Sequence, residues 1–165
     1  SWIKMVGVIL DTNIYGKIIA DNKEDSLKLV EAIKLDELFI IHNFKVIRDE
    51  LRQAPKILPL YDSLVCNTSI PIDNHIEKVA DLYFKEFKTR GGNQSKDKNF
   101  MNDLRIVACA SIKGFNLIFS DDNKSMHNPI LRKSFEEINL KYNYRTPSFY
   151  RYTDLKRKYL GTANY

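Results

Sequence analysis

The sequence is poor in the residues that build disulfide frameworks and zinc sites. Its 165 residues include two cysteines, Cys66 and Cys109, which are not in a CxxC arrangement. The three histidines (His42, His75 and His127) are scattered and form no pair at the spacing of metal ligands. We therefore expect free thiols and no zinc site. Isolated thiols and the lack of a recognisable secretory signal predict a reducing, cytoplasmic location.

Long apolar runs and internal repeats are also missing. No stretch approaches the ~20 apolar residues of a membrane-spanning helix, so we expect no membrane partner. With 44% hydrophobic and 28% charged residues, the composition is that of a soluble globular protein. A chain of 165 residues is long enough for one domain with a substantial core.

The net charge of +5 is concentrated near the C-terminal end. Residues 139–165 hold six basic residues, one acid and six of the nine tyrosines. Basic and aromatic side chains together suit an RNA partner, whereas the alternative is a solvated terminal helix with tyrosines packed on the body. A polar loop at residues 88–100, "KTRGGNQSKDKNF", carries further lysines that are either phosphate contacts or simply solvated. The candidate RNA contacts are Lys96, Lys98, Arg151, Lys156, Arg157 and Lys158.

Short uncharged runs alternate with helical patterns along the chain. Buried strands are predicted at residues 5–10, 38–41 and 115–119. Helices are predicted at residues 14–20, 44–53, 102–113 and 130–140, with Asp25 capping a further helix and Gly114 ending the third of these. The segment "TPSFYRY" predicts a last, edge strand. This alternation is typical of an α/β sandwich around a mostly parallel sheet.

An apolar stripe at helical spacing runs from Ile72 to Phe87. A stripe of this kind most often packs against the core of its own domain. The alternative is a binding surface for a partner, including a second copy of the chain, so a homodimer is a candidate assembly.

Two of the predicted strands end in acids. Asp11 follows "VGVIL", and Asp121 and Asp122 follow "FNLIFS". Helix capping would explain each aspartate alone, but the carboxyl ends of parallel strands meet at one edge of a sheet, where chemistry collects. Asp103 lies in the first turn of the helix predicted at 102–113, which we expect to open on the same edge. By composition alone, Glu50 is a surface helix residue.

Carboxylates that converge on one point repel one another unless a cation neutralises them. A set of oxygen ligands without His or Cys selects a hard ion such as Mg²⁺ or Mn²⁺. Sites of this kind carry out phosphoryl chemistry, in which a metal ion activates water and steadies the leaving oxygen.

The order of the motifs is more specific than any one of them. "VILDTN" is followed by "VIRDEL", then by "NDLRIVACASIKGFNLIFSDD" and finally by "RTPSFY". This ordered set covers nearly the whole chain and resembles the PIN-domain nucleases. The resemblance implies a three-layer α/β/α fold with a central, mostly parallel sheet of four or five strands. It also implies Mg²⁺- or Mn²⁺-dependent cleavage of RNA by a single domain at residues 1–152, with a basic extension at 153–165.

The resemblance also assigns roles to individual residues. The catalytic and metal-holding acids would be Asp11, Glu50, Asp103 and Asp122. Asp121 falls at a variable position and exchanges roles with Asp122 if the preceding strand ends one residue earlier. Asn13 would orient the first aspartate, and Ser120 matches the position of a small hydroxyl.

The chain departs from the compact members of the family at two places. A long insert separates Glu50 from Asp103, and the chain continues past the closing strand. Compact toxins of toxin–antitoxin pairs usually lack such additions, so a toxin role and an antitoxin partner stay open. The competing function is a catalytically silent PIN-like scaffold that binds RNA or protein, and the presence of all four acids counts against it. An aspartyl phosphatase is disfavoured because Asn13 stands where its general acid would be.

Overall fold

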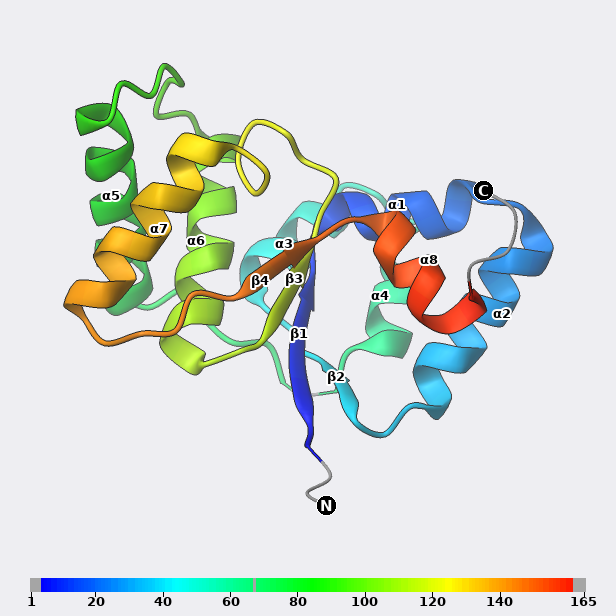
Figure 1. The fold of residues 1–165 in the computed structure, drawn as a ribbon. Coiled ribbons are helices and arrows are strands. Elements are labelled where there is room, and N and C mark those ends of the chain that lie inside the picture. The colour runs from blue at the N-terminus through cyan, green and yellow to red at the C-terminus, as the bar shows by residue number, and fades with distance from the viewer. Residues whose placement is uncertain (1–3, 67, 162–165) are drawn as a thin grey trace.

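The centre of the molecule is a sheet of four parallel strands in the order β2-β1-β3-β4. The computed structural model describes residues 4–66 and 68–161 (Figure 1). The strands are β1 (Val6–Leu10), β2 (Phe39–Ile41), β3 (Leu117–Phe119) and β4 (Ser148–Tyr150). In register, Val8 of β1 lies beside Ile41 of β2 and Leu117 of β3. The predicted parallel sheet and the predicted edge strand are therefore confirmed.

Helices flank the sheet on both sides. They are α1 (Thr12–Ala20), α2 (Lys23–Leu35), α3 (Lys45–Leu51), α4 (Leu58–Leu64), α5 (Asn74–Thr89), α6 (Lys98–Lys113), α7 (Pro129–Lys141) and α8 (Tyr152–Leu160). Figure 1 shows α5, α6 and α7 on one side of the strands and α1, α2 and α8 on the other. The predicted three-layer α/β/α arrangement is what the structure has. Among the described residues, no helix is long and apolar enough to span a membrane.

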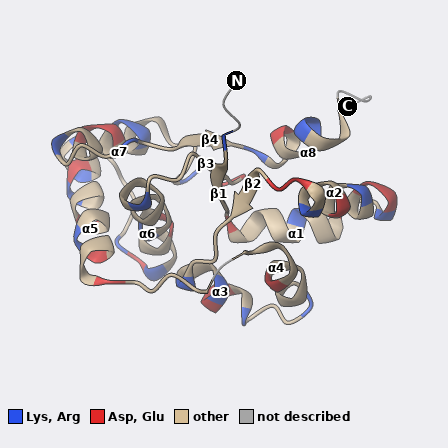
Figure 2. Cartoon of the chain, turned by 90° about the horizontal axis from the view of Figure 1, so that it is seen from below, with Lys and Arg blue, Asp and Glu red and all other residues tan. Residues whose placement is uncertain are grey.

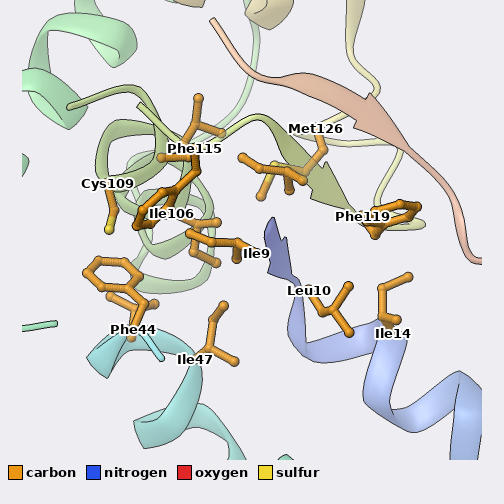
Figure 3. Packing of buried hydrophobic residues seen from close by; sticks show 14 of the residues in the cluster. Ile9, Leu10, Ile14, Phe44, Ile47, Ile106, Cys109, Phe115, Phe119 and Met126 are labelled. Atoms are coloured by element: carbon orange, nitrogen blue, oxygen red, sulfur yellow. The ribbon is translucent and has the colours of Figure 1, made fainter. Parts of the chain in front are cut away.

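Residues of β1 and its neighbours form the core between the layers. Ile9 and Leu10 are fully buried, as are Ile14 of α1 and Ile106 of α6. Figure 3 shows these side chains packed with the aromatic rings of Phe44, Phe115 and Phe119. β1 is a central parallel strand covered on both faces, which explains why none of its residues is charged and why the first charged residue, Asp11, follows its end.

Helices α2 and α6 begin at least three residues before their predicted starts. Helix α6 begins at Lys98 because Asp97 accepts a hydrogen bond from the backbone N–H of Phe100 (2.8 Å). Asp103 therefore lies in the second turn of α6, and the prediction that placed it in the first turn is wrong. Helix α2 is capped by Asn22 and not by the predicted Asp25. The predicted cap at Gly114 is confirmed, with φ of 74°.

The apolar stripe of the insert is core. On α5, Ile76, Val79 and Tyr83 are fully buried, and the helix packs against α6 and α7. The hydroxyl of Tyr83 donates a hydrogen bond to Asn139 of α7 (2.6 Å), and its ring meets that of Phe135 edge to face. Most of the stripe is thus covered inside the chain, whereas Ile72 and Phe84 are partly buried.

The C-terminal helix α8 packs on α2. Its Tyr152 and Leu155 are buried, and the ammonium of Lys156 lies 2.9 Å from Asp21 and 3.1 Å from Asp25. Burial raises the pKa of Asp21, and hydrogen bonds from Tyr152 and Lys156 lower it by more, so the net shift is downward. The domain boundary that we predicted after residue 152 falls within this helix.

Candidate active site

Asp11 stands immediately after β1, at the carboxyl edge of the sheet, and is only 4% exposed. Three groups donate hydrogen bonds to its carboxylate. The backbone N–H of Thr12 reaches one oxygen (2.8 Å), while the hydroxyl of Ser120 (2.7 Å) and the side-chain amide of Asn13 (3.1 Å) reach the other. Burial raises the pKa of Asp11 and these hydrogen bonds lower it, and the net shift is upward. The contacts fix the direction in which the carboxylate points.

Ser120 connects the ends of β1 and β3. It is fully buried; besides donating to Asp11, its hydroxyl accepts hydrogen bonds from the amide of Asn13 (3.2 Å) and from the backbone N–H of Asp122 (3.1 Å). Its carbonyl oxygen is 2.6 Å from Nε2 of His127. A carbonyl only accepts, so this ring nitrogen carries the proton. Ser120 thereby couples the position of Asp122 to that of Asp11.

Glu50 enters the site from α3. Its carboxylate accepts a hydrogen bond from the hydroxyl of Thr12 (3.3 Å), the residue next to Asp11. Burial, together with the charge of Asp11, raises the pKa of Glu50 to about 7, against the lowering effects of Thr12 and Lys98. Glu50 is therefore not the surface helix residue that its composition suggested.

Asp103 lies on α6, and Asp122 lies in the loop after β3. Asp103 accepts a hydrogen bond from the hydroxyl of Ser125 (2.8 Å). Burial and then the charge of Asp11 raise the pKa of Asp103 to about 9, and the neighbouring Asp122 adds to the increase. The carboxylate of Asp122 accepts a hydrogen bond from the backbone N–H of Lys124 (2.7 Å). Asp11, Asp103 and Asp122 are thus close enough for their charges to interact.

Asp121 makes different contacts. Its carboxylate accepts the backbone N–H of Tyr152 (2.9 Å) and lies 3.6 Å from the ammonium of Lys17. Its backbone N–H donates to the side-chain oxygen of Asn13 (3.0 Å). Asp121 therefore ties α8 and α1 to the end of β3, whereas Asp122 is the aspartate that faces Asp103.

The four acids offer a donor set of carboxylate oxygens, which is the chemistry that Mg²⁺ and Mn²⁺ select. Burial raises the pKa values of Asp11, Glu50 and Asp103, and the charge of a neighbouring acid adds to each increase, so the ionised carboxylates are costly unless a cation neutralises them. Across residues 4–66 and 68–161, however, no three His, Cys, Asp or Glu side chains already converge as a metal-binding group. The chemistry of these side chains fits a hard cation.

Two hollows open on either side of the N-terminal turn of α6. The Glu50 hollow has a volume of about 340 Å³ and reaches Glu50 and Asn102. The Asp103 hollow has a volume of about 470 Å³ and reaches Asp103 and Asp122. Lys98 lines both of them, so the acids are accessible from two sides.

Most of the predicted RNA contacts are engaged by other side chains of the protein. Figure 2 shows lysines and arginines on both helical layers. Lys96 pairs with Asp81, Arg151 donates to Asn123, Arg157 pairs with Asp154, and Lys158 lies over the rings of Phe39 and Tyr159. Lys156 is 7% exposed and paired with two aspartates, so we remove it from the predicted RNA contacts. Lys98 is the exposed basic residue from this set that lines both hollows.

Sequence reasoning missed three residues that hold the acids in place. Thr12 supports Asp11 and Glu50, Ser125 supports Asp103, and His127 holds the Ser120 carbonyl. Thr12 stands inside the motif "VILDTN" and could have been suspected from its position. Ser125 and His127 lie in an irregular loop, where no periodicity tells which way a side chain points.

Comparison with known proteins finds similarity in structure alone. No protein-family model and no curated protein matches the sequence. The structure of VapBC2 from Rickettsia felis bound to a DNA fragment from their promoter is 14% identical, with a TM-score of 0.55 over 88% of this chain and 98% of that chain. The structure of FitAcB from Neisseria gonorrhoeae is also 14% identical, with a TM-score of 0.54 over 88% of this chain and 98% of that chain. The structure of VapBC-1 from nontypeable Haemophilus influenzae is 14% identical, with a TM-score of 0.53 over 89% of this chain and 98% of that chain.

These neighbours are matched along almost their whole length, whereas about a tenth of the present chain falls outside each match. At 14% identity, the likeness concerns the fold and not the chemistry of the site. The parallel sheet between two helical layers and its match to these structures show that the chain has the PIN-like α/β/α fold.

Proposed function

We propose that this chain is an endoribonuclease that hydrolyses RNA phosphodiester bonds with the help of Mg²⁺ or Mn²⁺. The observation that carries the proposal is the placement of Asp11, Glu50, Asp103 and Asp122 at one edge of a PIN-like sheet. Burial and then the charge of Asp11 raise the pKa of both Glu50 and Asp103, and the part due to Asp11 supports a shared site. When bound, the metal ion would activate water and stabilise the leaving oxygen.

The side chains around the acids prepare the site. Ser120 and Asn13 hold the carboxylate of Asp11 in one direction, and Ser125 does the same for Asp103. Positioning of this kind limits the reorganisation that ligand binding requires. We assign Asp122 as the fourth ligand and leave Asp121 to its contacts with α1 and α8.

RNA is the substrate class that we propose, because basic side chains stand beside the acids. Lys98 lines both hollows, and Lys124 lines the Asp103 hollow. Cationic groups at these places would bind phosphates on either side of the bond to be cleaved. Arg151, Arg157 and Lys158 extend the basic character toward α8 and would contact a longer RNA.

We extend the proposal to a protein partner. The neighbouring structures are VapBC and FitAcB toxin–antitoxin complexes, so an antitoxin is the partner class that their fold suggests for this chain. Co-expression with the product of an adjoining small reading frame, followed by size-exclusion chromatography, tests it. Separate elution of the two proteins would contradict the proposal.

A silent scaffold is the second candidate, and one observation favours it. Within the described residues no three acidic side chains are already placed to hold a metal ion. A scaffold of this kind would bind RNA or protein equally well with and without divalent cations.

The deciding experiment measures cleavage of a labelled single-stranded RNA with Mg²⁺, Mn²⁺ or EDTA. We expect cleavage by the wild-type protein with either cation and none in EDTA. Glu50→Gln and Asp103→Asn should each reduce cleavage by about 100-fold or more, since each removes a charged ligand. Equal cleavage by the wild type and both variants would assign the activity to a contaminant and leave the scaffold as the better account.

A further inference from the structure

The loop between β3 and α7 carries two of the groups that build the acid site. Asp122 lies near its start, and Ser125, which donates to Asp103, lies in its middle. Residues 120–128 belong to no helix or strand, so the hydrogen bonds of regular secondary structure do not fix their position. The place of Asp122 in the site therefore depends on the individual contacts that hold this loop.

His127 holds the loop at two carbonyl groups. Its backbone N–H donates a hydrogen bond to the carbonyl of Asp122 (3.1 Å), and Nε2 of its ring donates to the carbonyl of Ser120 (2.6 Å). These two carbonyls belong to the peptide groups before Asp121 and after Asp122. One histidine thus fixes the backbone on both sides of the two aspartates.

The ring of His127 is in turn held by Arg132, in the first turn of α7. The guanidinium donates from Nη2 to Nδ1 of His127 (3.0 Å) and from Nε to the carbonyl of Met126 (3.1 Å). Because an arginine has donors and no acceptor, Nδ1 of His127 is the unprotonated nitrogen. The Ser120 carbonyl requires the proton on Nε2, so both contacts select the same neutral form of the ring.

Arg132 is itself fixed by an aromatic ring of the sheet. Its guanidinium lies over the ring of Phe149 in β4, 5.1 Å from the centroid, and Phe149 stacks on the fully buried Phe135 of α7. A planar cation that already lies on an aromatic face loses little freedom when it forms further hydrogen bonds. Arg132 therefore connects the loop to the packed interface between α7 and β4.

We propose that Arg132 and His127 are positioning residues of the acid site. Arg132 keeps the ring of His127 in the neutral form that donates from Nε2. His127 then holds the carbonyls of Ser120 and Asp122, and Asp122 stays beside Asp103. The inference rests on the proposed function for the role of the acids as cation ligands, and it adds to the site an α7 side chain that lines neither hollow.

Native-state hydrogen exchange in EDTA, followed by NMR, tests this positioning without a metal ion. The backbone N–H groups of Asp121 and Asp122 donate to the side chains of Asn13 and Ser120, so they report opening of the loop. We expect Arg132→Met to accelerate exchange at both amides by about tenfold relative to the amides of β1, because it removes two hydrogen bonds at the loop alone. His127→Phe should accelerate exchange at the same two amides.

Lys133→Met is the matched control, because it removes a cation from the next, exposed position of α7. It should leave the ratio of loop exchange to β1 exchange at its wild-type value. If Arg132→Met and His127→Phe accelerated exchange equally in the loop and in β1, or in neither, these residues would act only on the stability of the whole domain. Either result would overturn the inference.

A spectroscopic readout concerns the ring of His127 in the wild-type protein. A long-range ¹H–¹⁵N spectrum distinguishes protonated from unprotonated ring nitrogens, and comparison with His127→Phe assigns its signals among those of the three histidines. We expect the proton on Nε2. A proton on Nδ1 would be incompatible with donation from Arg132 and would also overturn the inference.

Calorimetric titration of Mn²⁺ connects the loop to the site. We expect Arg132→Met to bind Mn²⁺ about tenfold more weakly than the wild type, at the lower end of the range for groups that orient metal ligands, and Lys133→Met to bind it equally well. Unchanged affinity in Arg132→Met would overturn the inference and leave the proposed function intact. A wild-type protein that binds no Mn²⁺ would instead refute the proposed function, and the exchange ratio would still decide whether Arg132 positions the loop.

Discussion

Ser120→Ala is the substitution that most directly probes how the acids are held together. The change removes one hydroxyl that is fully buried and that makes three hydrogen bonds, to Asp11, Asn13 and Asp122. A hydrogen bond to a charged group contributes about 1.5–3 kcal/mol, and a buried donor left unpaired costs about 1–3 kcal/mol. Asp11 keeps its bonds from Thr12 and Asn13, so we expect a net loss of about 2–4 kcal/mol in the free energy of unfolding.

Urea unfolding followed by circular dichroism measures this loss, and Ser134→Ala is the matched control. Ser134 is also fully buried, but among the described residues its hydroxyl donates only to the carbonyl of Ile130, one turn earlier in α7 (2.8 Å). That carbonyl belongs to the helix interior, so the control should lose less than about 1 kcal/mol. If the two variants were destabilised equally, Ser120 would be a packing residue and the coupling between the strand ends would be refuted.

Three further predictions concern the body of the fold. Tyr15→Phe should leave stability unchanged or raise it by up to about 1 kcal/mol, because the buried Tyr15 hydroxyl has no hydrogen-bond partner among the described residues; a loss in thermal unfolding would contradict this. Cys66 should react with a thiol reagent in the native protein, and Cys109 should react only after denaturation. Cys109 is fully buried, and burial raises its pKa to about 12. If the absorbance of the reagent showed two reactive thiols in the native protein, this prediction would be wrong. Lys156→Gln should destabilise the protein at neutral pH and destabilise it less below pH 3.8. The reason is that the pKa of Asp21 is lowered in the folded protein, so its carboxylate stabilises the fold above pH 3.8 and loses this contribution as it protonates. A difference in melting temperature that does not change with pH would argue against the ion pair.

The sheet was predictable because its signals are local. β1, β2 and β3 are short uncharged runs, as buried parallel strands must be, and the cap at Gly114 needs only a positive φ. Helix α4 was not predicted, and its Pro59 lies in the first turn, where a proline is tolerated.

Contacts between distant segments were beyond the sequence. Lys156 is separated by 131 residues from its partner Asp25, and no local pattern distinguishes a lysine paired in this way from one on a solvated helix. The four candidate acids were proposed from the order of the motifs, and the structure has the fold that this order predicted. The contrast between Asp121 and Asp122 required knowing how the loop after β3 folds, because Asp121 contacts Tyr152 and Lys17 whereas Ser125 of this loop donates to Asp103 of α6.

The account depends most on whether the four acids bind a divalent cation, and calorimetric titration of Mn²⁺ into the protein measures this directly. The account predicts saturable binding by the wild type and binding at least 10-fold weaker in Asp103→Asn. Asp121→Asn, which removes an acid that faces α8 and Lys17, should bind Mn²⁺ as the wild type does. No saturable binding, or binding that Asp103→Asn leaves intact, would contradict the central claim.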